Sequence, residues 1–113
     1  MRLTRETILA LGRAREIIEV PEWGGAVIIA TLNLAERLEF ERWSATLPDD
    51  SGDYIVGLLA YAVVDDNGQR LFTQDDIKAL ADKSAAVLLR LSRVAQRLNR
   101  LGDAEVVAAQ GES

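Results

Sequence analysis

Acidic side chains are the main candidates for chemistry in this sequence, because it contains neither cysteine nor histidine. Without cysteine there is no disulfide, thiolate metal site or cysteine nucleophile. Without histidine the chain lacks the usual general base and the commonest metal ligand. Catalysis would have to come from carboxylates, and the pairs Asp49-Asp50 and Asp65-Asp66 lie in expected turns with no partner base. We therefore expect a protein that is not an enzyme.

One of these acidic pairs begins a segment that looks like a calcium-binding loop, Asp65-Asp66-Asn67-Gly68. If Gly68 is the sixth residue of such a loop, Val63 is its first ligand and Gln74 its twelfth. Both positions require an acidic side chain, so we reject the calcium site. The segment is instead typical of a tight turn, and we expect neither a metal nor a cofactor in this protein.

Basic side chains gather on one face of the longest predicted helix, Ser84–Leu101. Nothing within this segment breaks a helix, and Gly102 follows it as a C-terminal stop. Its apolar residues recur at three- and four-residue steps and form a single stripe, which needs a surface to cover it. The stripe consists of Val87, Leu88, Leu91, Val94, Ala95, Leu98 and Leu101, and the neighbouring face carries Arg90, Arg93, Arg97 and Arg100.

Part of this stripe could bind an amphipathic helix of another protein, in a groove shared with the apolar segment Tyr54–Val64. The arginines would then pair with the partner's carboxylates at the rim and set its orientation. In the alternative, the stripe belongs to the protein's own core and the arginines form a solvated face. The residues expected to bind a partner under the first hypothesis are Leu91, Val94, Leu98, Leu101, Arg90, Arg93, Arg97 and Arg100.

The remaining segments predict an α+β fold that is mainly helical, with a small N-terminal β-hairpin packed on about four to five helices. Two runs rich in β-branched residues flank a turn that contains proline and two glycines, and they form the hairpin. A break is expected at Asp82-Lys83-Ser84, and Leu71 and Phe72 are expected to fill the core. The predicted strands are Arg15–Val20 and Ala26–Leu32. Two further helices have cap signals: Arg5–Leu11 is capped by Thr4, and Leu34–Ser44 begins with a capping box of Asn33 and Glu36. The last two are a buried helix over Tyr54–Val64, whose end could be a strand, and a helix that Thr73 caps and that runs to about Ala81.

The chain of 113 residues is long enough for one domain with a core, which we place at residues 1–101. Residues 102–113 are small and acidic, and they are predicted to form a flexible tail. The formal net charge of −5 opposes long-range attraction to nucleic acid. No apolar run reaches membrane-spanning length and the N-terminus lacks a signal-peptide core, so we expect an intracellular protein that binds no membrane.

Three aromatic residues are large enough to anchor contacts between copies of the chain: Trp23, Phe40 and Trp43. Trp23 lies at the hairpin turn, and the other two lie on different sides of the helix Leu34–Ser44. Together with the open edge of the hairpin, they could support assembly into a ring or spiral. In the alternative, the rings pack inside the protein's own core, and the sequence leaves both hypotheses open.

Two ordered sets of short blocks resemble the phage tail assembly chaperone family. The N-terminal set is Val20-Pro21-Glu22-Trp23-Gly24-Gly25, then Thr31-Leu32 leading into Ala35-Glu36-Arg37. The C-terminal set is Val64-Asp65-Asp66-Asn67-Gly68-Gln69-Arg70-Leu71-Phe72, then Lys83-Ser84-Ala85-Ala86 and Ala95-Gln96-Arg97-Leu98-Asn99. The blocks keep the family's order and cover most of residues 16–101. One departure is Asp82, where the family pattern would have a glycine.

The resemblance implies a protein without catalytic residues that binds the tape measure protein, keeps its hydrophobic helices soluble and helps tail tube subunits polymerise around it. It also implies a homo-oligomer that works in the host cell cytoplasm and is absent from the mature virion. In many members a programmed frameshift gives a longer product that binds the tail tube protein, and this chain would be the short form. The alternatives are a structural tail component and a small helical regulator or antitoxin.

Overall fold

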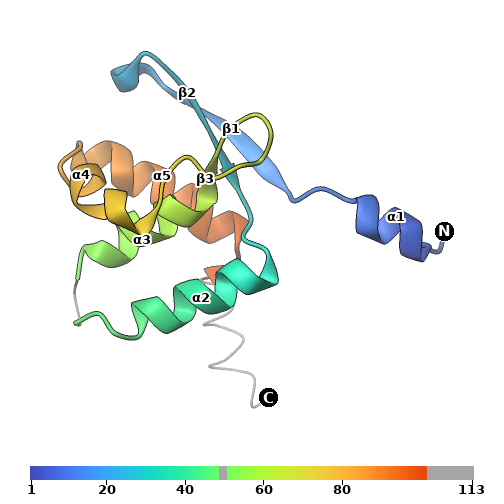
Figure 1. Cartoon of the computed structure of the whole chain (residues 1–113). Coiled ribbons are helices and arrows are strands. Elements are labelled where there is room, and N and C mark those ends of the chain that lie inside the picture. Colours follow the sequence, from blue (N-terminus) through green and yellow to red (C-terminus); the bar gives the residue numbers. More distant parts are fainter. Residues whose placement is uncertain (49–50, 102–113) are drawn as a thin grey trace, which may run out of the picture.

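The computed structural model describes residues 1–48 and 51–101, and its fold is α+β and mainly helical, as predicted (Figure 1). The described residues form five α-helices, two 3-10 turns and one antiparallel sheet with strand order β1-β2-β3. The predicted tail at 102–113 lies outside the described residues. In chain order the elements are α1 (Arg5–Ala10), β1 (Arg15–Val20), η1 (Pro21–Trp23), β2 (Gly25–Ala30), α2 (Leu34–Ser44), α3 (Asp53–Ala62), β3 (Val63–Val64), η2 (Gln74–Asp76), α4 (Ile77–Ala81) and α5 (Ala85–Leu98).

The predicted hairpin is present, with β1 and β2 paired from Arg15↔Ala30 to Val20↔Gly25. Gly24 closes its turn with a φ of 76°, a left-handed conformation that glycine adopts without strain. β2 is shorter than predicted, because the chain leaves the ladder after Ala30 and the Leu32 N–H bonds to the Asn99 side chain instead. A short third strand, β3, adds to the free edge of β2, which settles the ambiguous end of the predicted central helix.

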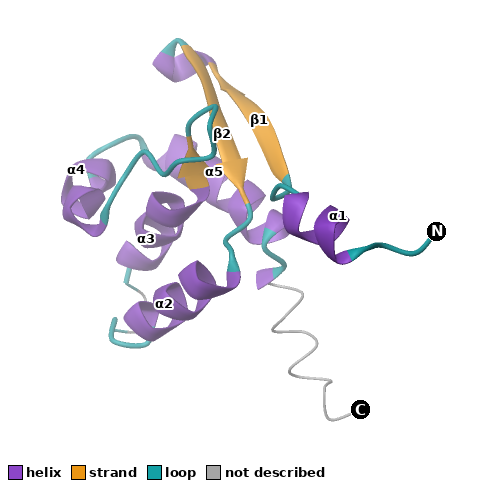
Figure 2. Ribbon diagram, turned by 45° about the vertical axis from the view of Figure 1, so that its right-hand side comes forward, coloured by secondary structure: helices purple, strands orange, loops and turns teal. Residues whose placement is uncertain are grey.

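Helix α3 is the centre of the fold, and it packs against α2, α4 and α5 (Figure 2). Its seven residues from Val56 to Ala62 are all buried, so the prediction of a buried central helix is confirmed, with its end at Ala62. Gly57 allows a close approach, because the ring of Trp43 lies where a side chain at this position would begin. The neighbour at this glycine is therefore a side chain of α2, which ties α2 to the core.

The long C-terminal helix ends three residues earlier than predicted, at Leu98. The side chain of Asn99 accepts from the Leu32 N–H at 2.7 Å and donates to the Ala95 carbonyl at 2.9 Å. Arg37 donates to the Asn99 carbonyl at 3.1 Å, and Arg100 takes a φ of 55°. These bonds to distant segments turn the chain before Gly102, so a single helix over 84–101 was a wrong prediction.

The first helix, α1, is capped as predicted, with the Thr4 hydroxyl accepting from the Thr7 N–H at 3.1 Å. It ends at Ala10, and it projects from the rest of the molecule beyond β1 (Figures 1 and 2). We call residues 1–12 the N-terminal arm. Within the described ranges, every helix is too short or too polar to cross a bilayer.

Candidate partner-binding surface

Neither pair of aspartates forms a described catalytic site. Asp65 stabilises a turn, and Asp49 and Asp50 lie outside the described residues. One oxygen of Asp65 accepts from the backbone N–H groups of Asn67 and Gln69, at 2.8 and 2.9 Å. These bonds form the predicted tight turn, and Gly68 completes it with a φ of 80°. In residues 1–48 and 51–101 the acidic side chains do not come together in groups that could hold a metal ion. The other candidates that the sequence offers are the arginines, the apolar stripe and the aromatic anchors.

Two of the three arginines on α5 hold the protein's own hairpin, and the fourth predicted arginine, Arg100, lies beyond the end of the helix. Arg90 forms a two-pronged ion pair with Glu22, at 2.9 and 3.1 Å, and Arg97 pairs with Glu16 at 2.6 Å. The hydrogen bonds from Arg90 lower the pKa of Glu22 to about 2, well below its ordinary value of 4.5. The paired residues are 68 and 81 positions apart, so spacing along the sequence could not reveal them. Arg90 and Arg97 fasten the hairpin to α5 in this structure.

The apolar stripe of α5 faces mainly inward. Leu91 and Leu101 are buried, and Val94 and Leu98 are partly buried and pack against the same core. Leu91 and Leu101 therefore belong to the protein's own core, which was the alternative to partner binding in the sequence analysis. Binding of a partner by Val94, Leu98 and the exposed Arg93 and Arg100 stays a prediction.

The three candidate aromatic anchors lie in different surroundings. Phe40 is 1% exposed and packs on Trp43, Tyr54 and Tyr61, with ring centroids 5.2–6.1 Å apart. The Tyr61 hydroxyl donates to Glu39 at 2.8 Å, and burial raises the pKa of Tyr61. Phe40 therefore cannot act as a surface anchor in this structure, because its ring is enclosed by α2 and α3. Trp43 is partly buried against Gly57.

Trp23 keeps 42% of its surface exposed and forms one wall of an apolar pocket of about 140 Å³. We call this cavity the tip pocket, because it lies under the hairpin turn. Leu71, expected in the core, is 52% exposed at the same pocket, since the segment after β3 runs over the surface there. All of its lining residues are apolar: Trp23 and Val27 of the hairpin region, Leu59, Val63, Leu71, Phe72, Leu80, Leu88 and Leu91.

The volume of the tip pocket indicates what it can admit. Cavities of about 150 Å³ with apolar walls take up a benzene-sized group and stay free of water otherwise. The tip pocket therefore suits one large aliphatic or aromatic side chain. Among the predicted partner-binding and assembly residues it brings together Trp23 and Leu91, from the hairpin turn and from α5. The pair Arg90–Glu22 supports this arrangement, because it fixes the turn next to Trp23.

Sequence reasoning missed most of this pocket. Trp23 at a turn was the one signal that pointed to it, whereas Leu71 and Val27 belong to ordinary apolar runs. Their grouping depends on how the sheet lies across α5, which no local pattern specifies. The arrangement can bind an apolar side chain.

Comparison with known proteins gives a match at the level of structure. No known sequence family and no curated protein matches this chain. Among solved structures, the tail assembly chaperone of bacteriophage HK97 is similar with a TM-score of 0.61 and 21% sequence identity. The match covers 78% of this chain and 83% of the HK97 protein. At this identity the match establishes a shared fold, and the HK97 protein bears the name of the family that the sequence blocks resemble.

Proposed function

We propose that this chain is a phage tail assembly chaperone that binds the tape measure protein and helps tail tube subunits polymerise around it. The observation that carries the proposal is the tip pocket, an apolar cavity with the exposed side chains of Trp23 and Leu71 at its rim. It occurs in a chain with the fold of the HK97 tail assembly chaperone. A chaperone needs such apolar surface to keep the helices of a client soluble.

In this proposal an amphipathic helix of the client inserts one large apolar side chain into the tip pocket. Trp23 and Leu71 cover the inserted side chain, as aromatic and aliphatic anchors do in helix-binding grooves. Val94 and Leu98 continue the contact along α5, and Arg93 pairs with client carboxylates and orients the helix. One pocket of this size supports moderate affinity, which suits a protein that must release its client.

The proposal includes the partners that the sequence blocks imply. The chain associates with further copies of itself, and a frameshifted, extended form binds the tail tube protein. It works in the host cell cytoplasm, is absent from the mature virion, and uses no cofactor, nucleic acid or membrane. A structural tail component is the nearest competing function, since it would share size and partners. Mass spectrometry of purified particles separates the two, because only a structural component stays in them at stoichiometric amounts.

Co-purification with the tape measure protein tests the client site. Leu71→Glu places a charge at the rim of the tip pocket, and we expect it to lower recovery of the client about tenfold. Leu34→Glu is the matched control, because Leu34 is also exposed and lies on α2, which does not line the pocket. Recovery with Leu71→Glu equal to that with Leu34→Glu would refute client binding at the tip pocket.

A further inference from the structure

The N-terminal arm carries apolar side chains that its own chain leaves uncovered. Ile8, Leu9 and Leu11 are each more than half exposed, and none of the residues of α1 is buried by the described part of the chain. A helix of six residues is far too short to be stable alone in water. Because α1 has a formed cap and an exposed apolar side, it needs another surface to cover that side.

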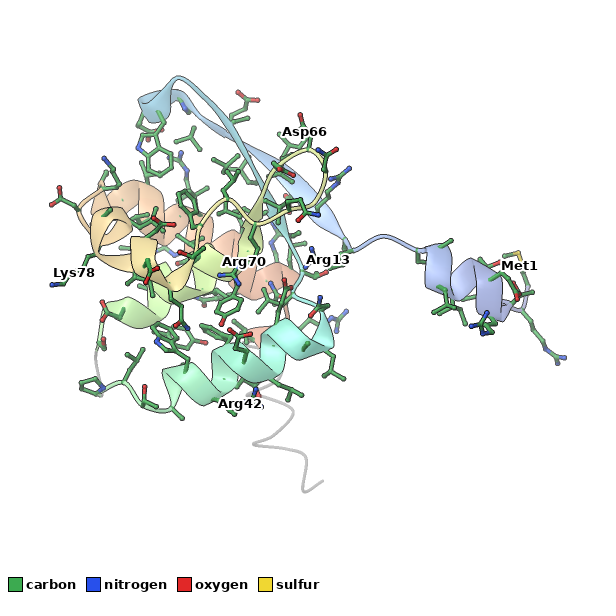
Figure 3. All side chains as sticks on the ribbon, viewed as in Figure 1. Met1, Arg13, Arg42, Asp66, Arg70 and Lys78 are labelled. Carbon is green, nitrogen blue, oxygen red and sulfur yellow. The ribbon has the colours of Figure 1, made fainter. Side chains whose placement is uncertain are left out.

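The base of the arm is fixed by Arg13. This guanidinium donates to the Thr31 carbonyl at 3.1 Å, to Glu36 at 2.7 Å and to the Gly68 carbonyl at 3.1 Å. Figure 3 shows Arg13 where the arm leaves the body, with Met1 at the far end. The arm therefore departs from a defined point beside the start of β1.

The tip pocket of the same chain is out of reach from this point. It opens beside Trp23, beyond the far end of β1, and the strand from Arg15 to Val20 spans about 17 Å at ~3.3 Å per residue. Ile8 and Leu9 lie only about 3–5 Å along the helix from Leu11 at ~1.5 Å per residue. A single residue, Gly12, separates Leu11 from the fixed Arg13. An arm tied at Arg13 thus cannot fill its own pocket, but it can fill that of a second copy.

The distribution of charge along the chain also favours a second copy as the partner of the arm. Residues 1–12 contain two arginines and one glutamate, a formal charge of +1, so residues 13–113 carry −6, which together give the chain's net charge of −5. Asp75 and Asp76 of η2 follow Phe72, which lines the tip pocket. The weakly basic arm of one copy is therefore attracted to the acidic body of another, whereas two acidic bodies repel each other.

We propose that the N-terminal arm of one copy docks in the tip pocket of a second copy, with one of Ile8 and Leu9 inside the pocket and the other against its rim. Arm and pocket lie at opposite ends of the hairpin, so the contact is head-to-tail and leaves a free arm and a free pocket on the resulting pair. The proposal shares the pocket with the proposed client site, but it does not require the client. It implies that a client helix and an arm compete for one cavity.

Sedimentation over a concentration series tests the contact with two variants that each remove one half of it. Ile8→Glu/Leu9→Glu disables the arm and leaves the pocket, and Leu71→Glu disables the pocket and leaves the arm. We expect the average mass of the wild type to rise above the 12.4 kDa of one chain, and each variant to stay at that mass. A mixture of the two variants should form a complex of twice the chain mass, because one intact arm and one intact pocket remain.

The controls separate assembly from misfolding. Circular dichroism and the thermal transition of each variant should match the wild type, and Leu34→Glu should assemble as the wild type does. A wild type that stays monomeric, an arm variant that assembles normally, or a mixture with no complex would each overturn the proposal. No client is present, so the outcome is independent of the proposed client binding: loss of client recovery by Leu71→Glu with normal assembly would overturn the arm contact alone.

Discussion

Helices α3 and α1 are both rich in apolar residues, but α3 is buried in the fold and α1 is exposed. Seven residues of α3 are buried between three other helices, whereas α1 stands on the arm with Ile8 and Leu9 exposed. The difference lies in what the neighbouring segments provide. α3 has Trp43 packed on Gly57, whereas Arg13 ties the base of the arm to the body at a point from which α1 projects outward. Apolar content predicts that a helix needs cover, and tertiary contacts decide whether its own chain supplies it.

A large loss of stability is expected from filling the close contact between Gly57 of α3 and Trp43. Gly57→Ala puts a methyl group where the ring of Trp43 lies, so the ring must shift within a packed core. We expect the free energy of unfolding to fall by about 2–3 kcal/mol, measured by urea denaturation. Gly52→Ala is the control, because open space surrounds that position. Equal stability of the two variants would mean that the contact between α2 and α3 is loose.

A smaller loss is expected at the base of the arm. Arg13→Ala removes three hydrogen bonds and leaves Glu36 with only its bonds in the capping box of α2. The free energy of unfolding should decrease by about 1–2 kcal/mol in the same assay. Arg42→Ala, at an exposed position on the same helix α2, should change it by less than about 0.5 kcal/mol. A loss no larger than that of the control would show that Arg13 does not fix the arm.

The hairpin turn should respond to pH through Glu22. Its pKa is about 2 in the folded protein and 4.5 ordinarily, so the unfolded chain binds more protons between these values. The stabilisation is complete above pH 4.5 and is lost as the pH falls towards 2. Unfolding of the wild type and of Glu22→Gln should therefore differ most near neutral pH and converge in acid. A constant difference across this range would contradict the role of the Arg90–Glu22 pair.

The smallest effect should come from the arm itself. Ile8→Ala and Leu9→Ala remove side chains that the body does not bury, so unfolding of dilute protein should change by less than about 0.5 kcal/mol. The matched change Leu59→Ala, in α3, should cost about 2–5 kcal/mol because Leu59 is buried. A comparable cost at Ile8 would show that α1 packs on its own body and would end the contrast between the two helices.

The local elements of this fold could be predicted from sequence because their signals are short-range. Thr4, Asn33 and Thr73 cap the helices or turns that follow them, through bonds to N–H groups two or three residues away. Alternating β-branched residues and Gly24 likewise specified the hairpin. The candidate site was harder to predict: Trp23 was one of two open hypotheses, core or anchor, Leu71 was expected in the core, and Phe40 was considered for the surface.

The sequence by itself determined where most helices and strands form, and it predicted a protein that binds through apolar surface. Only the tertiary structure decided which apolar residues stay exposed, since that depends on which segments meet. It also ended α5 at Leu98 through Asn99 and turned Arg90 and Arg97 towards the hairpin. The physical reason is range: a cap satisfies a donor within one turn of helix, whereas the ion pairs and the tip pocket join residues that only the folded chain brings together.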